Sequence, residues 1–306
     1  MPELRQFAEV RTGTGSLTVT VPCQFVHRAA VAETFLTGWV KTGTDRFRIT
    51  AQWPRAHQLH VSADRSAYEP LLVAETVRQS GALLAHAAYD APLGDCFVLQ
   101  ELHVDTRPEH LAVGAVPAAP VLDVTVDEVR RRGGRATGLR YEAVVHLGGE
   151  RIGGGRIAVT WTNASVYRRL RGGRTHTAAA LCLPPLPPAL PAAAVGRAQP
   201  ADVVLAAADR PDHWRLRVDT AHPVFFDHPL DHIPGMLMLE AARQAVRVRS
   251  GGERVAVSLR AAFHQYAELD QPVRVELSEV DGSHVQVVAV QGESVVFECL
   301  VGTAAR

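Results

Sequence analysis

The sequence predicts an α+β protein in which one structural unit occurs twice, each copy an antiparallel sheet wrapped around a long central helix. A first observation is the run Met236–Leu239, apolar on every side of a predicted helix, which is typical of an enclosed helix. A second is that this helix continues with Glu240, Arg243 and Gln244 on one face. A third is that the same pattern appears in the first half of the chain.

The repeat is specific because several residues match without a gap. A shift of 165 positions pairs His57 with His222, Leu72 with Leu237, Glu75 with Glu240, Arg78 with Arg243, and Gln79 with Gln244. An E-x-x-R-Q pattern with a histidine 18 residues upstream is hard to obtain twice by chance, so we interpret it as an internal duplication. A sheet wrapped around a single helix is the hotdog architecture, and two in tandem form a covalent counterpart of the hotdog dimer.

The order of predicted elements is also the same in both halves. Helices are expected over Leu71–Ala88 and Pro234–Arg249, each with a proline at or just before its first turn, where no backbone donor is needed. Alternating and β-branched runs predict the strands. In chain order these are a short one in the lead-in, Leu17–Val21, and then Phe47–Trp53, Cys96–Val104, Val121–Val129, Leu139–Leu147, Arg151–Trp161, His213–Val218, Val255–Phe263, Val273–Val280, Val285–Val290 and Ser294–Val301.

The chain divides at a proline-rich segment. Residues 1–182 are predicted to form an N-terminal hotdog domain with an irregular lead-in, and residues 201–306 a C-terminal hotdog domain. Residues 183–200 contain six prolines, so this segment is expected to be a semi-rigid linker. The expected assembly is a monomeric pseudo-dimer or a homodimer of such chains.

Composition indicates a soluble globular protein. Of 306 residues, 47% are hydrophobic and 21% are charged, and the formal net charge is zero. This balance supports a core and gives no basic field for nucleic acid or an acidic membrane. No apolar run reaches the ~18 residues of a transmembrane helix, and the N-terminus lacks a signal-peptide pattern.

Cofactor and metal sites are not expected. The four cysteines are scattered without a CxxC pair, which favours reduced thiols in a cytoplasmic protein over a structural zinc site. The glycine clusters lack the GxxxxGK[ST] arrangement of a nucleotide-binding loop.

Glu240 and Glu75 are the leading candidates for chemistry, because a carboxylate in an enclosed helix is costly unless it is paired or functional. Burial should raise the pKa of each carboxyl, whereas Arg243 and Arg78 should lower it. A carboxyl between these influences suits general acid–base catalysis. The alternative is a buried Glu–Arg pair that only fixes the helix position.

Histidines precede both helices, with His222, His228 and His232 before the second and His57 and His60 before the first. Their spacing matches no strong zinc signature. A histidine at a helix mouth could orient or deprotonate a substrate, and a capping or core histidine is the alternative. His222 and His228 are the candidates for acid–base assistance.

Arginines provide the candidate sites for a phosphate group, because a guanidinium binds phosphate through two hydrogen bonds. The candidates are Arg28, Arg55, Arg78 and Arg243. Since Lys41 is the only lysine, arginine is this chain's default cation, and its abundance alone carries little weight. Gln79 and Gln244 share the helix faces and are candidates for substrate binding.

The segment IPGMLMLEAARQA resembles the central-helix motif of β-hydroxyacyl-ACP dehydratases. In that family the catalytic histidine lies 14 residues before the acid, and here those positions hold Phe226 and Val61. A second resemblance covers most of the chain. FVHRAAVAETFLTGW, AQWPRAH, YEPLLVAETVRQSGALLAHA and FFDHPLDHIPGMLMLEAARQA resemble the A-factor biosynthesis (AfsA-like) family of tandem-hotdog proteins.

The AfsA-like resemblance implies an enzyme that makes a signalling molecule of the γ-butyrolactone, butenolide or furan type. Such an enzyme joins a β-ketoacyl group, carried as a thioester on acyl carrier protein, to the hydroxyl of dihydroxyacetone phosphate. The ester then closes by aldol-type attack and loss of water to a phosphorylated butenolide. Glu240 is expected to be the main acid–base residue, with Arg243 binding phosphate or tuning Glu240, and Glu75 and Arg78 are the matched pair.

Two other readings fit the same residues. A double-hotdog acyl-thioester hydrolase or dehydratase would use the helix carboxylate without a phosphate-binding arginine. A non-catalytic acyl-binding regulatory protein would use the fold alone. Retention of Glu, Arg and Gln in both halves argues against the latter.

Overall fold

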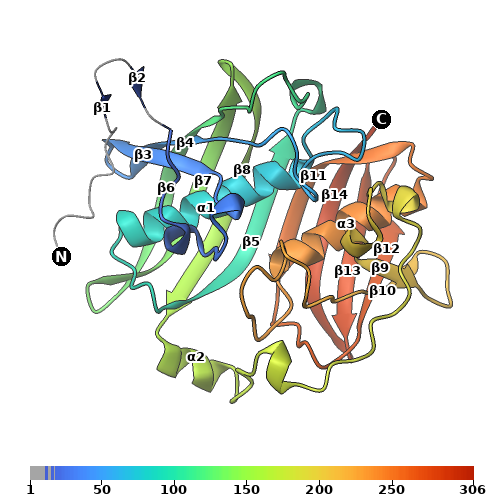
Figure 1. The fold of residues 1–306 in the computed structure, drawn as a ribbon. Coiled ribbons are helices and arrows are strands. Elements are labelled where there is room, and N and C mark those ends of the chain that lie inside the picture. Colours follow the sequence, from blue (N-terminus) through green and yellow to red (C-terminus); the bar gives the residue numbers. More distant parts are fainter. Residues whose placement is uncertain (1–10, 13–14, 17) are drawn as a thin grey trace.

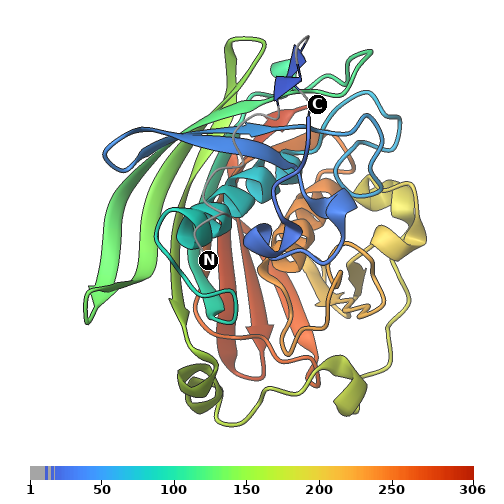
Figure 2. The ribbon, with the colours of Figure 1, turned by 60° about the vertical axis from the view of Figure 1, so that its left-hand side comes forward.

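The fold is one continuous antiparallel sheet of twelve strands with two long helices on one face (Figure 1). The computed structural model describes residues 11–12, 15–16 and 18–306. The start of the predicted lead-in lies outside the described residues, and the strand predicted at Leu17–Val21 is wrong, because residues 18–21 belong to no strand. The strand order is β3-β4-β6-β7-β8-β5-β11-β14-β13-β12-β10-β9. Figure 2 shows the sheet curving around the helices, which confirms the predicted double hotdog.

Each half supplies six strands to this sheet. The N-terminal half contains β3 (Leu36–Gly43), β4 (Arg46–Ala51), β5 (Cys96–Thr106), β6 (Val121–Arg132), β7 (Arg135–Leu147) and β8 (Glu150–Thr162). The C-terminal half contains β9 (Leu205–Ala207), β10 (His213–Leu216), β11 (Arg254–Phe263), β12 (Val273–Glu279), β13 (His284–Gln291) and β14 (Ser294–Ala305). A separate two-residue hairpin, β1 (Arg11–Thr12) and β2 (Gly15–Ser16), precedes them.

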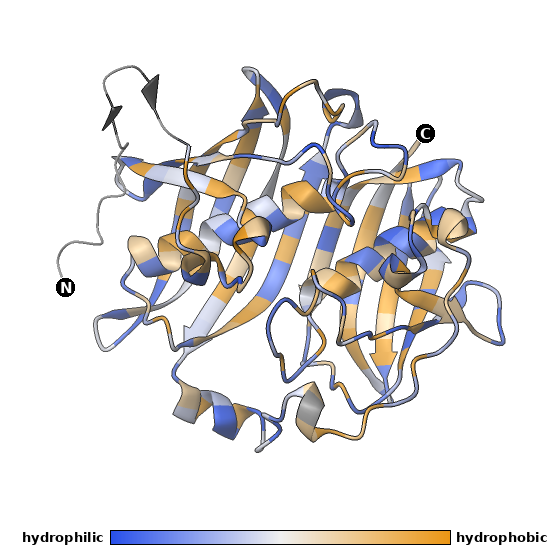
Figure 3. Cartoon of the chain, in the orientation of Figure 1, coloured by the Kyte–Doolittle hydropathy of each residue, from blue (hydrophilic) through white to orange (hydrophobic). Residues whose placement is uncertain are grey.

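Strand order is the same in both halves when each is read from its outer edge, because β3-β4-β6-β7-β8-β5 corresponds to β9-β10-β12-β13-β14-β11. The halves meet at β5 and β11, which pair antiparallel with Leu102 opposite Ala261. This pairing gives the pseudo-dimer inside one chain. Along β13 buried and half-buried residues alternate, as a strand with one face on the core requires, and Figure 3 shows such banding on the C-terminal strands.

The central helices are α1 (Pro70–Ala87) and α3 (Gly235–Arg249), which lie side by side across the sheet (Figure 1). Pro70 occupies the first turn of α1 and Pro234 the N-cap of α3. Both helices are buried on nearly every side over their first three turns, as the apolar runs predicted. In the described part of the chain, no helix is long and apolar enough to cross a membrane.

Between the halves, the chain forms α2 (Ala164–Leu170), which is capped by Asn163, and a short 3₁₀ helix, η4 (Ala178–Ala180). It then passes through the proline-rich segment to a further 3₁₀ helix, η5 (Ala192–Val195). Another short helix, η6 (Pro200–Asp202), leads into β9. The same arrangement precedes β3, where η1 (Cys23–Val26) and η2 (Val31–Glu33) occur. The segment predicted as a linker therefore includes a helix that repeats η1.

Candidate active site between the two halves

The first cluster of buried charge surrounds Glu75 on α1. Its Oε1 atom accepts hydrogen bonds from Arg28 Nε (3.0 Å) and Nη2 (2.7 Å) and from Arg78 Nη2 (2.7 Å), while Oε2 accepts from Arg78 Nε (2.8 Å). Burial alone would raise the pKa of Glu75, but Arg28 and Arg78 outweigh it and hold this pKa well below its usual range. Glu75 is thus an ionised carboxylate that fixes two guanidinium groups.

Gln79 joins this cluster to the segment before β3. Its Nε2 atom donates to Glu75 Oε1 at 2.8 Å and to the Glu33 carbonyl at 2.7 Å. Its Oε1 atom accepts from the Phe35 backbone N–H at 3.0 Å. These bonds use both amide hydrogens, and the side chain is fully buried, so Gln79 positions the cluster.

A second cluster surrounds Glu240 on α3 and repeats the first. Glu240 accepts from Arg197 Nε (2.8 Å) and Nη2 (2.5 Å), from Arg243 Nε and Nη2 (both 2.9 Å), and from Gln244 Nε2 (2.5 Å). Gln244 also donates to the Asp202 carbonyl and accepts from the Val204 N–H, as Gln79 does in the first half. Burial alone would raise the pKa of Glu240, but Arg197 and Arg243 outweigh it and lower this pKa to about 2.

Each cluster contains a bond from one half of the chain to the other. Arg28 Nη1 donates to the carbonyl of Val224 at 2.8 Å, and Arg197 Nη1 donates to the carbonyl of Leu59 at 2.5 Å. Positions 59 and 224 differ by the same 165 residues that relate the helix motifs. The two charged clusters are therefore part of the interface between the hotdogs.

Arg197 was not predicted, and neither were Glu69 and Asp227. Arg28 and Arg197 are separated by 169 positions, not 165, so an ungapped shift does not pair them. The signal is the shared spacing P-x-x-x-V-x-R, which begins at Pro22 and at Pro191. A second comparison with this shift would have found Arg197.

The clusters differ in what lies beyond the arginines. Glu69 lies beside the second cluster, with its carboxylate 3.9 Å from Arg197 Nη1 and 3.7 Å from Arg243 Nη1. The position equivalent to Glu69 beside the first cluster is Pro234. In the described part of the chain, the Nη1 atom of Arg78 takes part in no hydrogen bond. Its side chain is 19% exposed, against 7% for Arg243.

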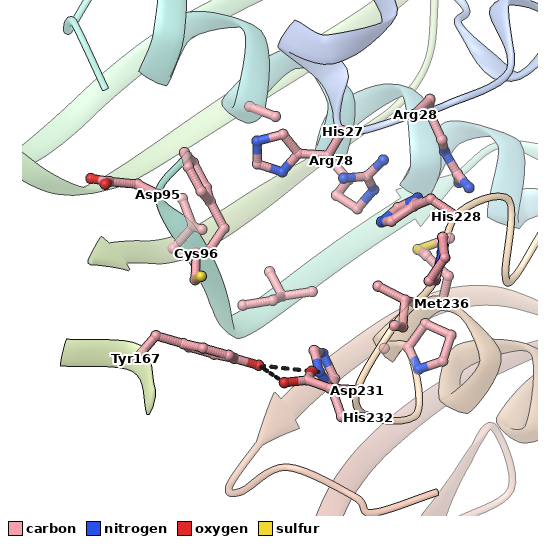
Figure 4. Close-up of a pocket in the computed structure, with 18 of the residues that line it drawn as sticks. His27, Arg28, Arg78, Asp95, Cys96, Tyr167, His228, Asp231, His232 and Met236 are labelled. Atoms are coloured by element: carbon pink, nitrogen blue, oxygen red, sulfur yellow. Dashed lines mark hydrogen bonds and ion pairs between the residues drawn. The ribbon is translucent and has the colours of Figure 1, made fainter. Parts of the chain in front are cut away.

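A cavity of about 810 Å³ lies against the first cluster and is lined by both halves. Figure 4 shows His27, Arg28, Arg78 and His228 gathered at one end, and Tyr167, Asp231 and His232 at the other. Apolar side chains line the space between them, including Leu93, Phe97, Leu99, Ile157, Val159 and Met236. Glu240, Arg243, Gln244 and His222 do not line it.

His228 is the predicted histidine that faces the cavity. Its Nδ1 atom lies 2.6 Å from Asp227 Oδ1, and Asp227 also lies 3.6 Å from Arg28 Nη1 and accepts from the Ala29 N–H at 2.8 Å. Burial raises the pKa of Asp227, but the bond to His228 and the charge of Arg28 lower it overall. A charged Asp227 therefore fixes the ring of His228 with one nitrogen turned from the carboxylate.

His222 and His57 occupy equivalent closed positions. His222 Nδ1 accepts from the N–H groups of Val224 and Phe225, and its Nε2 lies 3.2 Å from Asp202. His57 makes the same bonds to Leu59, His60 and Glu33. In both rings, each nitrogen thus interacts with another group of the protein. These interactions fix the loops that lead into the two helices.

Three ligand-type side chains, Glu33, His57 and His60, come within 4.8 Å of one another, a separation that a metal ion could bridge. However, His57 Nδ1 accepts two backbone N–H groups, so its single ring proton lies on Nε2, facing Glu33. A protonated nitrogen has no lone pair for a metal. The bonding of His57 does not fit a metal site.

Arg55 lies apart from both clusters. Its side chain is exposed and its Nε atom donates to the Gly114 carbonyl at 2.9 Å. It does not line the cavity, so of the predicted phosphate-binding arginines only Arg28 and Arg78 reach it.

The A-factor biosynthesis hotdog domain family matches residues 12–163 and 182–299. A protein of Streptomyces virginiae named 2-oxo-3-(phosphooxy)propyl 3-oxoalkanoate synthase is 46% identical over 293 residues, covering 94% of this chain and 98% of that protein. A protein of the same name from Streptomyces coelicolor is 37% identical over 284 residues, covering 90% and 89%.

Among solved structures, an acyl-ACP thioesterase from Bacteroides thetaiotaomicron matches with a TM-score of 0.54 and 15% identity, covering 84% of this chain and 98% of that one. At this identity the likeness shows the fold alone. The family match, in contrast, spans both halves, and the relatives match over nearly their full length. This protein belongs to the A-factor biosynthesis (AfsA) hotdog family.

Proposed function

We propose that this protein is an acyltransferase that joins a 3-oxoacyl group, supplied as a thioester, to the free hydroxyl of dihydroxyacetone phosphate. The product is the ester named in its relatives, a 2-oxo-3-(phosphooxy)propyl 3-oxoalkanoate. The observation that carries the proposal is the cavity of about 810 Å³, which has two fixed guanidinium groups at one end and an apolar wall beyond them.

The phosphate is proposed to bind at Arg28 and Arg78. Glu75 holds both guanidinium groups from behind, which leaves Arg78 Nη1 directed away from that carboxylate. In the second cluster the matching atom, Arg243 Nη1, faces the carboxylate of Glu69. In the second cluster, Glu69 thus occupies the position that a substrate phosphate would take beside Arg78 in the first. A guanidinium group suits a phosphate because it can form two parallel hydrogen bonds with it.

This assignment places the reaction beside Glu75, not beside Glu240. Glu240 is fully buried and already accepts hydrogen bonds from two arginines and Gln244. It does not line the cavity, so it cannot contact a substrate bound there. We propose that both glutamates position arginines, and that only the first pair contacts substrate.

The acyl chain is proposed to lie along the apolar wall formed by β5, β8 and the start of α3, where Phe97, Ile157 and Met236 line the cavity. His228, fixed by Asp227, is proposed to give acid–base assistance. The ester product contains an acidic methylene and a ketone, so the methylene carbon can attack the ketone carbon and water can leave. This ring closure to the phosphorylated butenolide is part of the proposal.

Acyl carrier protein is the proposed donor. Arg168 on α2 lines the cavity, and its side chain and those of Arg169 and Arg174 are exposed. In the described part of the chain none of the three forms an ion pair, so this end of the cavity presents free positive charge to an acidic carrier.

The cytoplasm is the proposed location. All four cysteines are unpaired thiols, and Cys299 is buried. Free thiols of this kind fit a reducing compartment.

The test is incubation of the purified protein with a 3-oxoacyl thioester and dihydroxyacetone phosphate, followed by mass spectrometry. The proposal predicts a new mass equal to the ester, or to the ester less one water after ring closure. Release of free 3-oxo acid with no condensed product would instead indicate a thioesterase, and would contradict the proposal.

A further inference from the structure

His27 lies at the charged end of the cavity, beside Arg78 (Figure 4), and was not among the residues predicted from sequence. It ends η1 in the left-handed backbone region, with φ of 55°. At the equivalent position in the second half, η5 ends with Gly196 at φ 69°. A left-handed backbone suits glycine, and a larger residue kept there is often found at a functional site.

The protonation pattern of His27 follows from its partners. His86 Nδ1 lies 2.8 Å from the carbonyl oxygen of Ala91, which can only accept, so His86 carries its proton on Nδ1. The Nε2 atom of a neutral His86 is then an acceptor. His27 Nε2 lies 2.7 Å from it and must donate. The lone pair of His27 is therefore on Nδ1.

The surroundings keep His27 neutral. Burial lowers its pKa to about 3, and the positive charge of Arg78 adds to this effect, as do His86 and His228. The ring is held between His86 and Phe97, with ring centroids 5.0 and 4.4 Å away. In the described part of the chain Nδ1 of His27 has no hydrogen-bond partner. The cavity thus contains a fixed, unoccupied acceptor next to the proposed phosphate site.

We propose that His27 is the general base of the acyl transfer and takes the proton of the acceptor hydroxyl on Nδ1, with His86 as its positioning residue. The inference rests on the function proposed above. Burial is the largest cause of the low pKa of His27, and the charge of Arg78 is the second. Phosphate bound at Arg28 and Arg78 would offset this second cause, so that His27 becomes a stronger base when the acceptor is in place.

The step balances within the site. As the hydroxyl oxygen bonds to the thioester carbonyl carbon, its proton moves to Nδ1 of His27. When the tetrahedral intermediate collapses, the carbon–sulfur bond breaks, sulfur keeps the electron pair, and the thiolate takes the proton from His27. The ester and the free thiol leave, and His27 is neutral again.

Gly196, at the equivalent position of the second half, suggests a variant that separates folding from catalysis. In His27→Gly the left-handed backbone is relieved, as at Gly196, while the base is removed. The relieved backbone should offset part of the packing lost with the ring, so we expect the variant to stay folded with only a small fall in melting temperature. We also expect a fall in kcat of about 10²–10⁴-fold and little change in KM for dihydroxyacetone phosphate. Added imidazole should restore part of the rate by filling the vacated space.

Arg65→Gly is the matched control. Arg65 is also left-handed, with φ of 59°, but its side chain is exposed and lies outside the cavity, so its activity should equal that of the parent chain. For His86, the change to Leu should lower kcat without raising KM, and the change to Gln, which restores an acceptor, should recover more of the rate.

If the parent chain forms no ester, the proposed function fails before His27 is tested. If the parent chain forms ester and folded His27→Gly keeps its kcat, the inference about His27 is wrong. Loss of kcat in His228→Ala with kcat retained in His27→Gly would assign the base to His228 instead. Loss of kcat in His27→Gly with no rescue by imidazole and with a raised KM would reduce His27 to a packing role.

Discussion

Glu240 shows how a buried carboxylate stays charged in this protein. It accepts hydrogen bonds from Arg197, Arg243 and Gln244, and these offset the free energy lost on removing the charge from water. The pKa of Glu240, about 2, lies below the ~4.3 of an unfolded glutamate. Its contribution to stability is thus complete above about pH 4.3 and is lost as the pH falls toward 2.

Replacing Glu240 by Gln should lower the free energy of unfolding at pH 7 by about 3–5 kcal/mol, because two buried arginines lose their main anion. The remaining fall in stability between pH 4.3 and 2 should also be shallower than in the parent chain. Urea denaturation at pH 7 and pH 3 measures both. Glu142→Gln, which removes an exposed carboxylate paired with Arg156, is the control and should change little. If the stability of Glu240→Gln fell as much between pH 7 and pH 3 as that of the parent chain, Glu240 would not be the source of the pH dependence.

Glu69 tests the idea that the second cluster contains an internal anion. In Glu69→Gln the Nη1 atoms of Arg197 and Arg243 lose the carboxylate that lies 3.7–3.9 Å away. Inorganic phosphate should then raise the melting temperature of the variant more than that of the parent chain, because a second anion site becomes available. Equal shifts in thermal denaturation would mean that Glu69 does not stand in for an anion.

Along α1, one small residue makes room for the cavity wall. A Cβ atom at Gly81 would lie 2.3 Å from Tyr141 Oη, and Tyr141 reaches under the helix to donate to the Val77 carbonyl at 2.8 Å. The position equivalent to Gly81 on α3 is Val246. The two helices therefore differ at this position, and Gly81 lines the cavity whereas Val246 does not.

Gly81→Ala should destabilise the protein by about 1–3 kcal/mol through overpacking against Tyr141, and it should slow ester formation because Tyr141 lines the cavity. Thermal denaturation and the mass-spectrometric assay measure the two effects. Gly94→Ala, where a Cβ would meet nothing within 4 Å, is the matched control. Full stability and activity in Gly81→Ala would show that Tyr141 moves aside at no cost.

The elements that the sequence predicted best are those with strong periodicity. The α1 and α3 helices and ten strands follow apolar runs, and their observed ends lie within a few residues of the predicted ones. The missed elements include β3, β9 and α2. Their positions are set by pairing with β4, by pairing with β10, and by the cap at Asn163, respectively. Arg197 was missed because a proline-rich composition indicated a linker, whereas the contact that orders this segment is with Glu240, 43 positions away. Contacts of this kind have no local pattern in sequence.

At the scale of the whole molecule, the two hotdogs are joined by strand pairing and by hydrogen bonds from buried arginines. They share the β5–β11 pairing, and Arg28 and Arg197 each bond to a carbonyl of the other half. Neither half can satisfy these groups alone.

Unfolding should therefore be a single transition by calorimetry, with the calorimetric enthalpy equal to the van't Hoff enthalpy. Separately produced halves should associate with each other, and neither should reach the parent melting temperature on its own. Two resolved transitions, or a half that folds at full stability, would contradict a shared interface.

We propose one working substrate site per chain, at the arginine pair beside Glu75. Calorimetric titration with dihydroxyacetone phosphate tests it most directly, using the parent chain, Arg78→Lys and Arg243→Lys. Lysine keeps the charge at either position but removes the planar fork that binds phosphate. We expect one site per chain, an affinity about 10-fold or more weaker in Arg78→Lys, and an unchanged affinity in Arg243→Lys. Two sites per chain, or binding lost with Arg243 and kept without Arg78, would contradict it.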